Sequence, residues 1–234
     1  MAFTKKDAPH CDWCPYRTNC YYDLIGNKEA QKTWKEMRLA HTFRTGEVVM
    51  YEGETPHALY VVCTGKVKVY KSSRTGQQLT TRVEYPGDLV GHIAMFAEGT
   101  YTSNVEALEP SVISMVDKRT FLNYLVRFPN SALALLKVLS IDVRRGENKA
   151  RDIAFKPARG RLADTLIGMM QPRKPYPIIS GIKRRDLGEM SGLTIETTVR
   201  LLKDFESRGI IRREEKDIVI IGPDQLKSMA GSAS

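Results

Sequence analysis

Three cysteines lie close together near the start of the 234-residue chain. Cys11, Cys14 and Cys20 follow the spacing Cys-x2-Cys-x5-Cys, and Pro15 disfavours a helix across the motif. One loop with this spacing can wrap around a compact centre, and soft thiolates suit zinc or an iron–sulfur cluster. The motif therefore predicts a metal or cluster site in an N-terminal arm, residues 1–27. The alternative is three free thiols in a mobile arm.

A second group of informative residues lies between positions 183 and 205. Two short helices are expected on either side of Gly192, because glycine suits a tight turn with an unusual backbone angle. Thr194 is placed to cap the second helix. Four residues recur at helical spacing and should face the core: Thr198, Leu201, Leu202 and Phe205. This pattern predicts a helix-turn-helix.

The opposite face of the second helix has the side chains to read a major groove. Arginine can bond guanine, glutamate can accept from cytosine, and an apolar tip can touch a thymine methyl group. The residues predicted to read bases are Ile195, Glu196, Val199, Arg200 and Lys203. The residues predicted to contact phosphates are Lys183, Arg184 and Arg185.

A β-hairpin predicted over 208–221 would add a wing bearing Arg212 and Arg213. The alternative, a solvated charged helix face, accounts for the charges but not for the turn, the cap and the wing together. The whole constellation therefore predicts binding to double-stranded DNA.

The elements that must position these residues can be read from the pattern of the chain. Asn27 is a plausible cap for a helix over 28–41, and Asp117 for a helix over 118–127. Between them, short alternating runs punctuated by glycine predict a barrel or jelly roll. The expected strands are 48–51, 58–63, 66–70, 79–83, 88–91 and 112–116.

A proline-free stretch over 129–156 predicts a long helix. A heptad seam along it is typical of a helix that pairs with a partner helix, which predicts a homodimer. The alternative is an ordinary long core helix. The seam consists of Ala132, Leu136, Leu139, Val143, Gly146, Ala150 and Ile153.

After this helix, a short helix is expected over 161–170, followed by a proline-rich connection over 171–177. The predicted organisation is an arm at 1–27, a sensor domain at 28–128, a dimerisation helix at 129–156 and a DNA-binding domain at 157–234.

Composition narrows the class of protein. Hydrophobic residues make up 42% and charged residues 27% of the chain, which is ordinary for a globular protein. Its formal net charge of +9 favours an anionic partner such as nucleic acid. The sequence has neither the apolar run of about 20 residues that spans a membrane nor a signal peptide. A cytoplasmic protein without a membrane partner is expected.

The chain resembles the cyclic-AMP receptor protein superfamily of bacterial transcription regulators. The sensor half supplies Gly87-Asp-Leu-Val-Gly91, and the DNA half supplies the run from Gly192 to Leu202. The resemblance implies an α+β fold: an N-terminal β-roll (a double-stranded jelly roll), a long dimerisation helix and a C-terminal winged helix-turn-helix. It also implies a regulator that is not an enzyme, a pseudo-palindromic operator and contact with RNA polymerase.

Within that superfamily, the three clustered cysteines resemble the fumarate and nitrate reduction (FNR) branch, which implies an oxygen-labile 4Fe–4S cluster that permits dimerisation and DNA binding. Glu196 and Arg200 also match that branch, whereas Val199 stands where it has serine. The branch takes its fourth cysteine from a position that is Ser114 here. Cys63, on another strand of the roll, is therefore the expected fourth ligand. The alternative is that Cys63 is a small buried apolar residue. In that case the fourth ligand is a carboxylate or a histidine, or there is no fourth ligand.

Other sensing chemistries remain as alternatives. The arm could hold structural zinc, or its thiols could form disulfides on oxidation. The family's nucleotide pocket uses a glutamate and an Arg-Ser pair, where this chain has His92 and Thr102-Ser103. Without an arginine for the phosphate, cyclic AMP binding is not expected. A haem sensor using His92 is not expected either.

Overall fold

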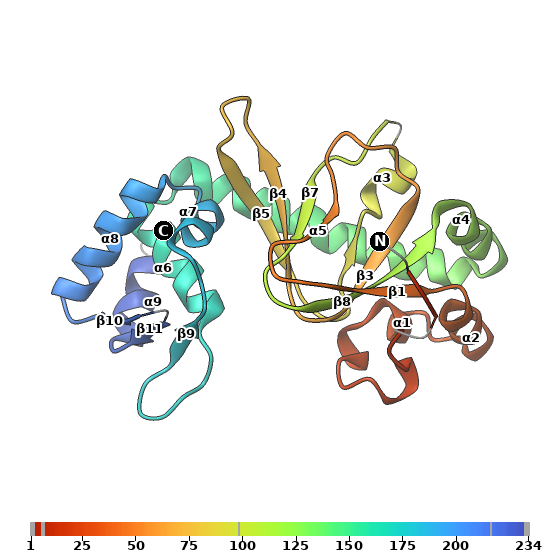
Figure 1. Ribbon diagram of the computed structural model, residues 1–234, viewed down its shortest axis with the longest axis horizontal. Coiled ribbons are helices and arrows are strands. Elements are labelled where there is room, and N and C mark those ends of the chain that lie inside the picture. Colours follow the sequence, from red (N-terminus) through yellow and green to blue (C-terminus); the bar gives the residue numbers. More distant parts are fainter. Residues whose placement is uncertain (1–2, 6–7, 98, 216, 232–234) are drawn as a thin grey trace. The chain divides into compact units, whose positions relative to one another are not determined.

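The computed structural model of the protein describes residues 3–5, 8–97, 99–215 and 217–231. The chain divides into two units, described separately below. The first combines Met1–Lys71 with Thr81–Arg145, and the second combines Ser72–Thr80 with Gly146–Ser234. The helices and strands of these units confirm the predicted α+β fold with a β-roll, a long helix and a C-terminal winged helix-turn-helix (Figure 1).

Two four-stranded sheets build the roll, with strand orders β1-β8-β3-β6 and β2-β7-β4-β5. Strand β8 is central in its sheet: Ser114 is paired with Ala40 of β1 on one side and with Val61 of β3 on the other. Apolar side chains from both sheets form the core of the roll. The strands are β1 (Leu39–Phe43), β2 (Val48–Met50), β3 (Ala58–Thr64), β4 (Val67–Ser72), β5 (Gln78–Glu84), β6 (Leu89–Val90), β7 (Asn104–Ala107) and β8 (Ser111–Asp117).

Short helices surround the roll, and two of the predicted caps are confirmed. The Asn27 side chain accepts a hydrogen bond from the backbone of Ala30, and Asp117 accepts one from Thr120. The helices are η1 (Cys11–Trp13), η2 (Arg17–Asn19), α1 (Tyr21–Leu24), α2 (Lys28–Glu36), α3 (Ile93–Phe96) and α4 (Lys118–Arg127).

One predicted boundary in this region is wrong. The helix expected over 28–41 ends at Glu36, and Leu39–Phe43 forms β1 instead. Pairing of this segment with β8 satisfies its backbone groups and buries Ala40 and Phe43. Tertiary pairing therefore overrides the partial helical pattern of the sequence.

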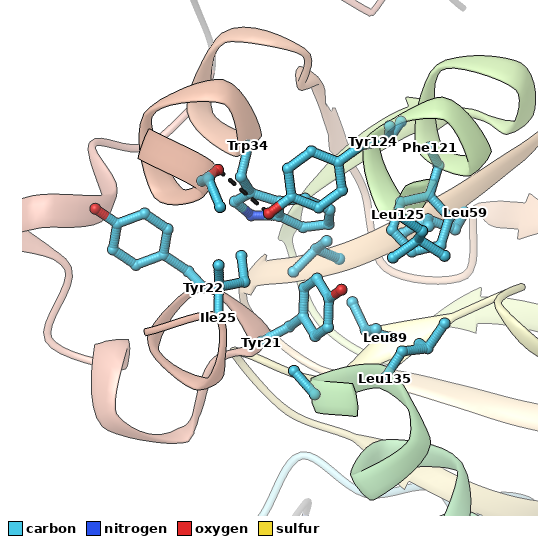
Figure 2. Close-up of a cluster of buried hydrophobic side chains, with 14 of the residues drawn as sticks. Tyr21, Tyr22, Ile25, Trp34, Leu59, Leu89, Phe121, Tyr124, Leu125 and Leu135 are labelled. Carbon is cyan, nitrogen blue, oxygen red and sulfur yellow. Dashed lines mark hydrogen bonds between the residues drawn. The ribbon is translucent and has the colours of Figure 1, made fainter. Parts of the chain in front are cut away.

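Tyr21, Tyr22 and Ile25 of the N-terminal arm pack into the core of the first unit (Figure 2), whereas Trp13 is 85% exposed. Tyr21 lies edge-on to Trp34 with ring centroids 4.9 Å apart, and Phe121 and Tyr124 of α4 complete the aromatic cluster. The Tyr21 hydroxyl donates to the carbonyl oxygen of Ser131, at a distance of 2.7 Å. The arm is therefore joined to the beginning of the long helix.

The long helix α5 (Pro129–Phe155) matches the predicted range to within one residue. Its buried side includes Ala134 and Leu135, whereas Leu136 and Val143 of the predicted seam are 56% and 61% exposed. Leu139 is partly buried, and the remaining later seam positions are exposed: Gly146, Ala150 and Ile153. Much of the seam is thus left uncovered within one chain. No single described helix is long and apolar enough to span a membrane, although the bent pair α4 and α5 meets those criteria together.

The second unit contains a three-stranded sheet with the order β10-β11-β9, packed with four helices (Figure 1). The predicted hairpin is present, but β9 and α9 were not predicted, and α6 begins three residues before the predicted position 161. The elements are α6 (Ala158–Met169), β9 (Ile178–Ser180), α7 (Arg184–Ser191), α8 (Ile195–Ser207), β10 (Ile211–Glu214), β11 (Asp217–Ile220) and α9 (Pro223–Gly231).

Candidate functional site

All four cysteines of the chain line one pocket of the first unit. The pocket has a volume of about 350 Å³, which includes space open to solvent. Its remaining lining residues come from the arm, from strand β3 and from the connections before β1 and β6: Pro9, Tyr16, Arg17, Tyr22, Arg38, Val61, Val62 and Gly87. Folding therefore brings Cys63 into the same pocket as the three cysteines of the arm, while its role as a ligand stays a prediction of the family resemblance.

A chain of tight turns places the arm cysteines. The backbone N–H groups of Cys14, Arg17 and Cys20 each donate to the carbonyl three residues earlier, at 3.3, 3.2 and 3.0 Å. Between the first two cysteines, the Asp12 carboxylate accepts from Lys35 Nζ and from the Tyr22 hydroxyl, both at 2.6 Å. These bonds fix the cysteine loop against α2.

Strand β3 presents Cys63 through an irregularity in the sheet. Pairing with β8 shifts register between Val62 and Thr64, and Cys63 is the extra residue. Such a bulge changes the direction in which a side chain points. The Cys63 thiol lies 3.3 Å from the Ser114 hydroxyl, so a cysteine at 114 would place its sulfur next to that of Cys63.

Arg38, which the sequence did not single out, reaches into the same pocket. Its Nη2 donates to Cys11 Sγ at 2.8 Å and to the carbonyl of Pro9 at 3.4 Å. Its Nη1 lies 3.4 Å from Ser114 Oγ and 3.9 Å from Cys63 Sγ. No sequence signal marks this residue, because its partners are far away along the chain and meet it only after folding.

Burial dominates the electrostatics of the thiols. It raises the pKa of Cys11 despite the opposing effect of Arg38, and it raises the pKa of Cys20 to about 12. Binding of a metal centre by these groups would therefore release protons. Among the described residues, no three His, Cys, Asp or Glu side chains are placed to hold a single metal ion. The thiols are spread around the pocket rather than gathered at one point.

A second pocket of the roll, of about 280 Å³, is lined by Thr102 and Ser103 and also by Arg82 of β5. The expectation that this region lacks an arginine is therefore wrong, because β5 supplies one from a distant part of the sequence. Its guanidinium already pairs with the Asp142 carboxylate at 2.8 Å and lies 3.0 Å from the carboxyl group of Glu84.

His92, which lies in the chain between the pocket-lining Gly91 and Ile93, is fully buried, with Nε2 2.9 Å from the Asp142 carboxylate. Burial by itself would raise the pKa of Asp142, but the bond to His92 and the nearby Arg82 and Arg145 together lower it. The charge of Arg82 is therefore balanced within the chain.

In the second unit, the local geometry of the predicted helix-turn-helix is confirmed. Gly192 ends α7 in the left-handed region, with φ 63° and ψ 44°. Thr194 caps α8 by accepting from the N–H of Thr197 at 3.2 Å. Gly188 is a further requirement: a Cβ there would come within 3.0 Å of Leu193 O and of Thr198 Oγ1. Its small size therefore lets the two helices approach.

The two faces of α8 divide as predicted. The four predicted core residues are buried, and Ile195, Glu196, Arg200 and Lys203 are exposed, with Val199 half-buried. Within the described residues, Glu196, Arg200 and Lys203 have no ion-pair partner, which leaves them available to a ligand.

The expected phosphate-contacting residues Lys183, Arg184 and Arg185 are also exposed, and Arg185 pairs with Glu189 at 3.2 Å. The wing arginines are less available, because Arg212 pairs with Glu214 at 2.8 Å and Arg213 with Glu206.

Each unit of the chain matches the profile of a known protein family. Residues 40–128 match the family profile of the cyclic nucleotide-binding domain, and residues 160–229 match that of the Crp-like helix-turn-helix domain. The "CRP-like cAMP-activated global transcriptional regulator" of Mycobacterium tuberculosis is 28% identical, over 80% of this chain and 86% of the relative. The "Fumarate and nitrate reduction regulatory protein" of Escherichia coli is 25% identical, over 96% and 91%.

Solved structures agree on the fold. FixK2 from Bradyrhizobium japonicum superposes with a TM-score of 0.72 at 23% identity, covering 84% of this chain and 99% of that one. The c-di-GMP responsive regulator CLP of Xanthomonas campestris superposes with a TM-score of 0.76 at 18% identity, covering 84% and 100%. With both family profiles matched in order, the chain belongs to the CRP/FNR family of DNA-binding transcription regulators.

Proposed function

We propose that this regulator senses oxygen or redox state through a 4Fe–4S cluster held by Cys11, Cys14, Cys20 and Cys63, and that the cluster controls dimerisation. The observation that carries the proposal is that every cysteine of the chain lines one pocket. One of them, Cys63, comes from a strand that is distant from the arm in sequence. Four thiolates are the ligand set that such clusters use. When bound, the cluster would supply a centre that oxygen destroys.

The residues of the chain provide a route from this pocket to the long helix. Cys20 is followed directly by Tyr21, whose hydroxyl bonds to the Ser131 carbonyl in the first turn of α5. Ligation of Cys20 would hold this tyrosine in place, and loss of the ligation would loosen it. The arm therefore acts on the end of α5 from which the apolar seam begins.

The exposed seam supports a dimer. Leu136 and Val143 are more than half exposed within one chain, and pairing with a second α5 would bury them. Because burial of such side chains contributes about 1.5–3 kcal/mol each, small changes in the seam shift the population of dimers.

A dimer would present two copies of α8 to DNA. Symmetric pairing places recognition helices in successive major grooves about one turn apart, which suits a pseudo-palindromic operator. Arg200 and Glu196 are exposed without internal ion-pair partners among the described residues, so they are assigned to base reading. Contact with RNA polymerase rests on family resemblance alone.

The test is anaerobic purification followed by the visible spectrum and by iron, sulfide and zinc analysis. A brown protein with about four iron and four sulfide per chain, bleached by air, supports the proposal. A colourless protein containing zinc would refute it in favour of a structural metal. Cyclic AMP added to the same sample is expected to leave DNA binding unchanged; a large increase would instead assign the sensing role to the pocket beside Arg82.

A further inference from the structure

Arg38 is an unusual residue to find in a buried position. Arg38 is only 4% exposed and lies in the connection between α2 and β1. Among the described residues, no carboxylate lies within ion-pair distance of its guanidinium. A buried arginine without a counter-ion is costly, because its positive charge has lost water and gained no negative partner.

The donors of Arg38 are directed at the pocket rather than at a carboxylate. They reach Cys11 Sγ at 2.8 Å and approach Cys63 Sγ at 3.9 Å, which joins the arm to strand β3. The remaining donor, Nε, is buried and has no hydrogen-bond partner. A nine-tenths buried side chain that donates to one thiol sulfur, approaches another and keeps one donor unused is suited to an anionic occupant of this pocket.

We infer that Arg38 is the counter-cation of the cysteine pocket: it balances the negative charge of metal-bound thiolates and donates hydrogen bonds to sulfur atoms there. The inference rests on the proposed use of the four cysteines as ligands and adds a residue that is not a ligand. Thiolate ligation makes the centre anionic, so a permanent positive charge beside it favours retention.

The same charge has a predictable effect on redox behaviour. Reduction adds negative charge to the pocket, and a nearby guanidinium stabilises the more negative state. Arg38 therefore raises the reduction potential of the bound cluster. Hydrogen bonds donated to sulfur act in the same direction.

The experiment compares wild type with Arg38→Met, Arg38→Lys and Arg17→Met, all purified without air. Arg17 is the matched control, because it lines the same pocket but is more exposed and is paired with Asp23 at 3.0 Å. Retention of iron is followed after addition of a chelator. Arg38→Met is expected to lose iron about tenfold to a hundredfold faster, with the lysine variant between it and wild type. Arg17→Met should have a much smaller effect than Arg38→Met, because the charge of Arg17 is paired with Asp23 and is partly exposed.

Two further readouts separate a charge effect from a structural one. The midpoint potential of the cluster should move to more negative values in Arg38→Met and less so in Arg38→Lys. In the metal-free reduced protein, Arg38→Met should show an unchanged or higher urea midpoint, because the uncompensated charge is gone. A lower urea midpoint with unchanged iron retention would overturn the inference and make Arg38 a structural residue.

The outcome also separates this inference from the proposed function. If wild type holds a cluster and Arg38→Met retains it equally well, the inference fails while the cluster stands. If wild type holds zinc, the cluster proposal fails, and faster zinc loss from Arg38→Met would still support the counter-cation. A wild type with neither iron nor zinc would overturn both.

Discussion

At the residue scale, the cysteine pocket combines four sulfur atoms with one buried guanidinium, that of Arg38, and its fourth sulfur comes from an irregular position in a sheet. Cys63 is the extra residue at the register shift of β3, and Ser114 on β8 faces it at 3.3 Å. The two positions are near enough that either could deliver a thiolate to the same pocket. This proximity makes the fourth ligand testable by exchange.

We expect Cys63→Ser to lose the cluster, because a hydroxyl is a poor replacement for a thiolate. The double variant Cys63→Ser with Ser114→Cys should recover at least part of the iron content, since it moves the sulfur across only the 3.3 Å gap. Iron and sulfide analysis of anaerobic samples measures both. An intact cluster in the single variant would remove Cys63 from the ligand set.

In the helix-turn-helix, Arg200 on α8 and Lys183 at the start of α7 should behave differently. Arg200→Ala is expected to cost roughly 1–3 kcal/mol of discrimination at one base position. Lys183→Ala should weaken binding to all sequences alike. It should also reduce by about one the slope of log affinity against log salt concentration. Selection of binding sites from a random DNA pool, followed by titration in salt, distinguishes them. Unchanged base preference in Arg200→Ala would show that this side chain does not read DNA.

At the element scale, the cysteine arm and the long helix are connected by the Tyr21 hydroxyl and the Ser131 carbonyl. Figure 2 shows how Tyr21 and Trp34 from the N-terminal part share one core with Tyr124 of α4 and Leu135 of α5. Under the proposed function, we expect a change in the cysteine loop to reach the start of α5 through this shared core.

Tyr21→Phe is expected to lower the stability of the first unit by about 1 kcal/mol, because it removes one buried hydrogen bond. It should also weaken the dimer of the cluster-bound protein. The matched control is Tyr101→Phe, which removes a buried tyrosine–carbonyl bond to Ala58 elsewhere in the roll. Urea unfolding and sedimentation equilibrium report the two effects. Equal dimer affinity in both variants would exclude Tyr21 as the connection.

A pH dependence follows from the charged residues that join β5 to α5. Burial raises the pKa of Glu84 to about 8. The negative charges of Asp88 and Asp142 act in the same direction, whereas the positive charges of Arg82 and Arg145 oppose the shift. The carboxyl group of Glu84 binds its proton more tightly in the folded than in the unfolded protein. Its contribution to the free energy of unfolding is therefore full below pH 4.5, the ordinary pKa of a glutamate, and is lost as the pH rises through 8.

Glu84→Gln cannot lose that proton, so its stability should fall less between about pH 6 and about pH 9, by a difference on the order of 1–3 kcal/mol. Urea unfolding of wild type and variant at both pH values gives the comparison. Identical slopes would mean that Glu84 is ionised throughout this range.

The elements that the sequence predicts well are those specified by local signals. The caps at Asn27, Asp117 and Thr194 and the turn at Gly192 lie within a few residues of the helices they delimit. Strand β1 was missed, because only pairing with the distant β8 makes Leu39–Phe43 extended.

The site follows the same division. The arm cysteines and the reading face of α8 could be predicted from spacing, and Cys63 from family resemblance. Arg38 and Arg82 could not be predicted, because each acquires its role from partners that are remote in sequence: Cys63 and Ser114 for Arg38, and Asp142 for Arg82.

At the scale of the whole molecule, oxygen-controlled dimerisation requires that the state of the pocket changes how strongly two chains associate. The seam of α5 has large apolar residues in its first half, while Gly146 lies exposed further along, where an added Cβ would meet nothing within 4 Å. A weak second half suits a switch, because the dimer is then only marginally stable.

Gly146→Leu should strengthen the dimer about tenfold or more, because one leucine is added to the apolar seam. It should also allow DNA binding without the cluster. Gly168→Leu is the control, since this exposed helical glycine of α6 also has nothing within 4 Å of an added Cβ and lies outside the seam. Sedimentation equilibrium and DNA titration measure the result. Persisting cluster dependence in Gly146→Leu would show that the seam is not the switch.

The most direct test of oxygen-controlled dimerisation uses one anaerobic wild-type sample, measured before and after exposure to air. Sedimentation velocity gives the oligomeric state, the visible spectrum gives the cluster content, and titration with a selected operator gives DNA affinity. Before exposure to air, we expect a brown dimer that binds the operator tightly. After exposure, we expect a bleached, mainly monomeric protein that binds the operator weakly. A protein that bleaches yet remains an equally tight dimeric binder would contradict oxygen-controlled dimerisation.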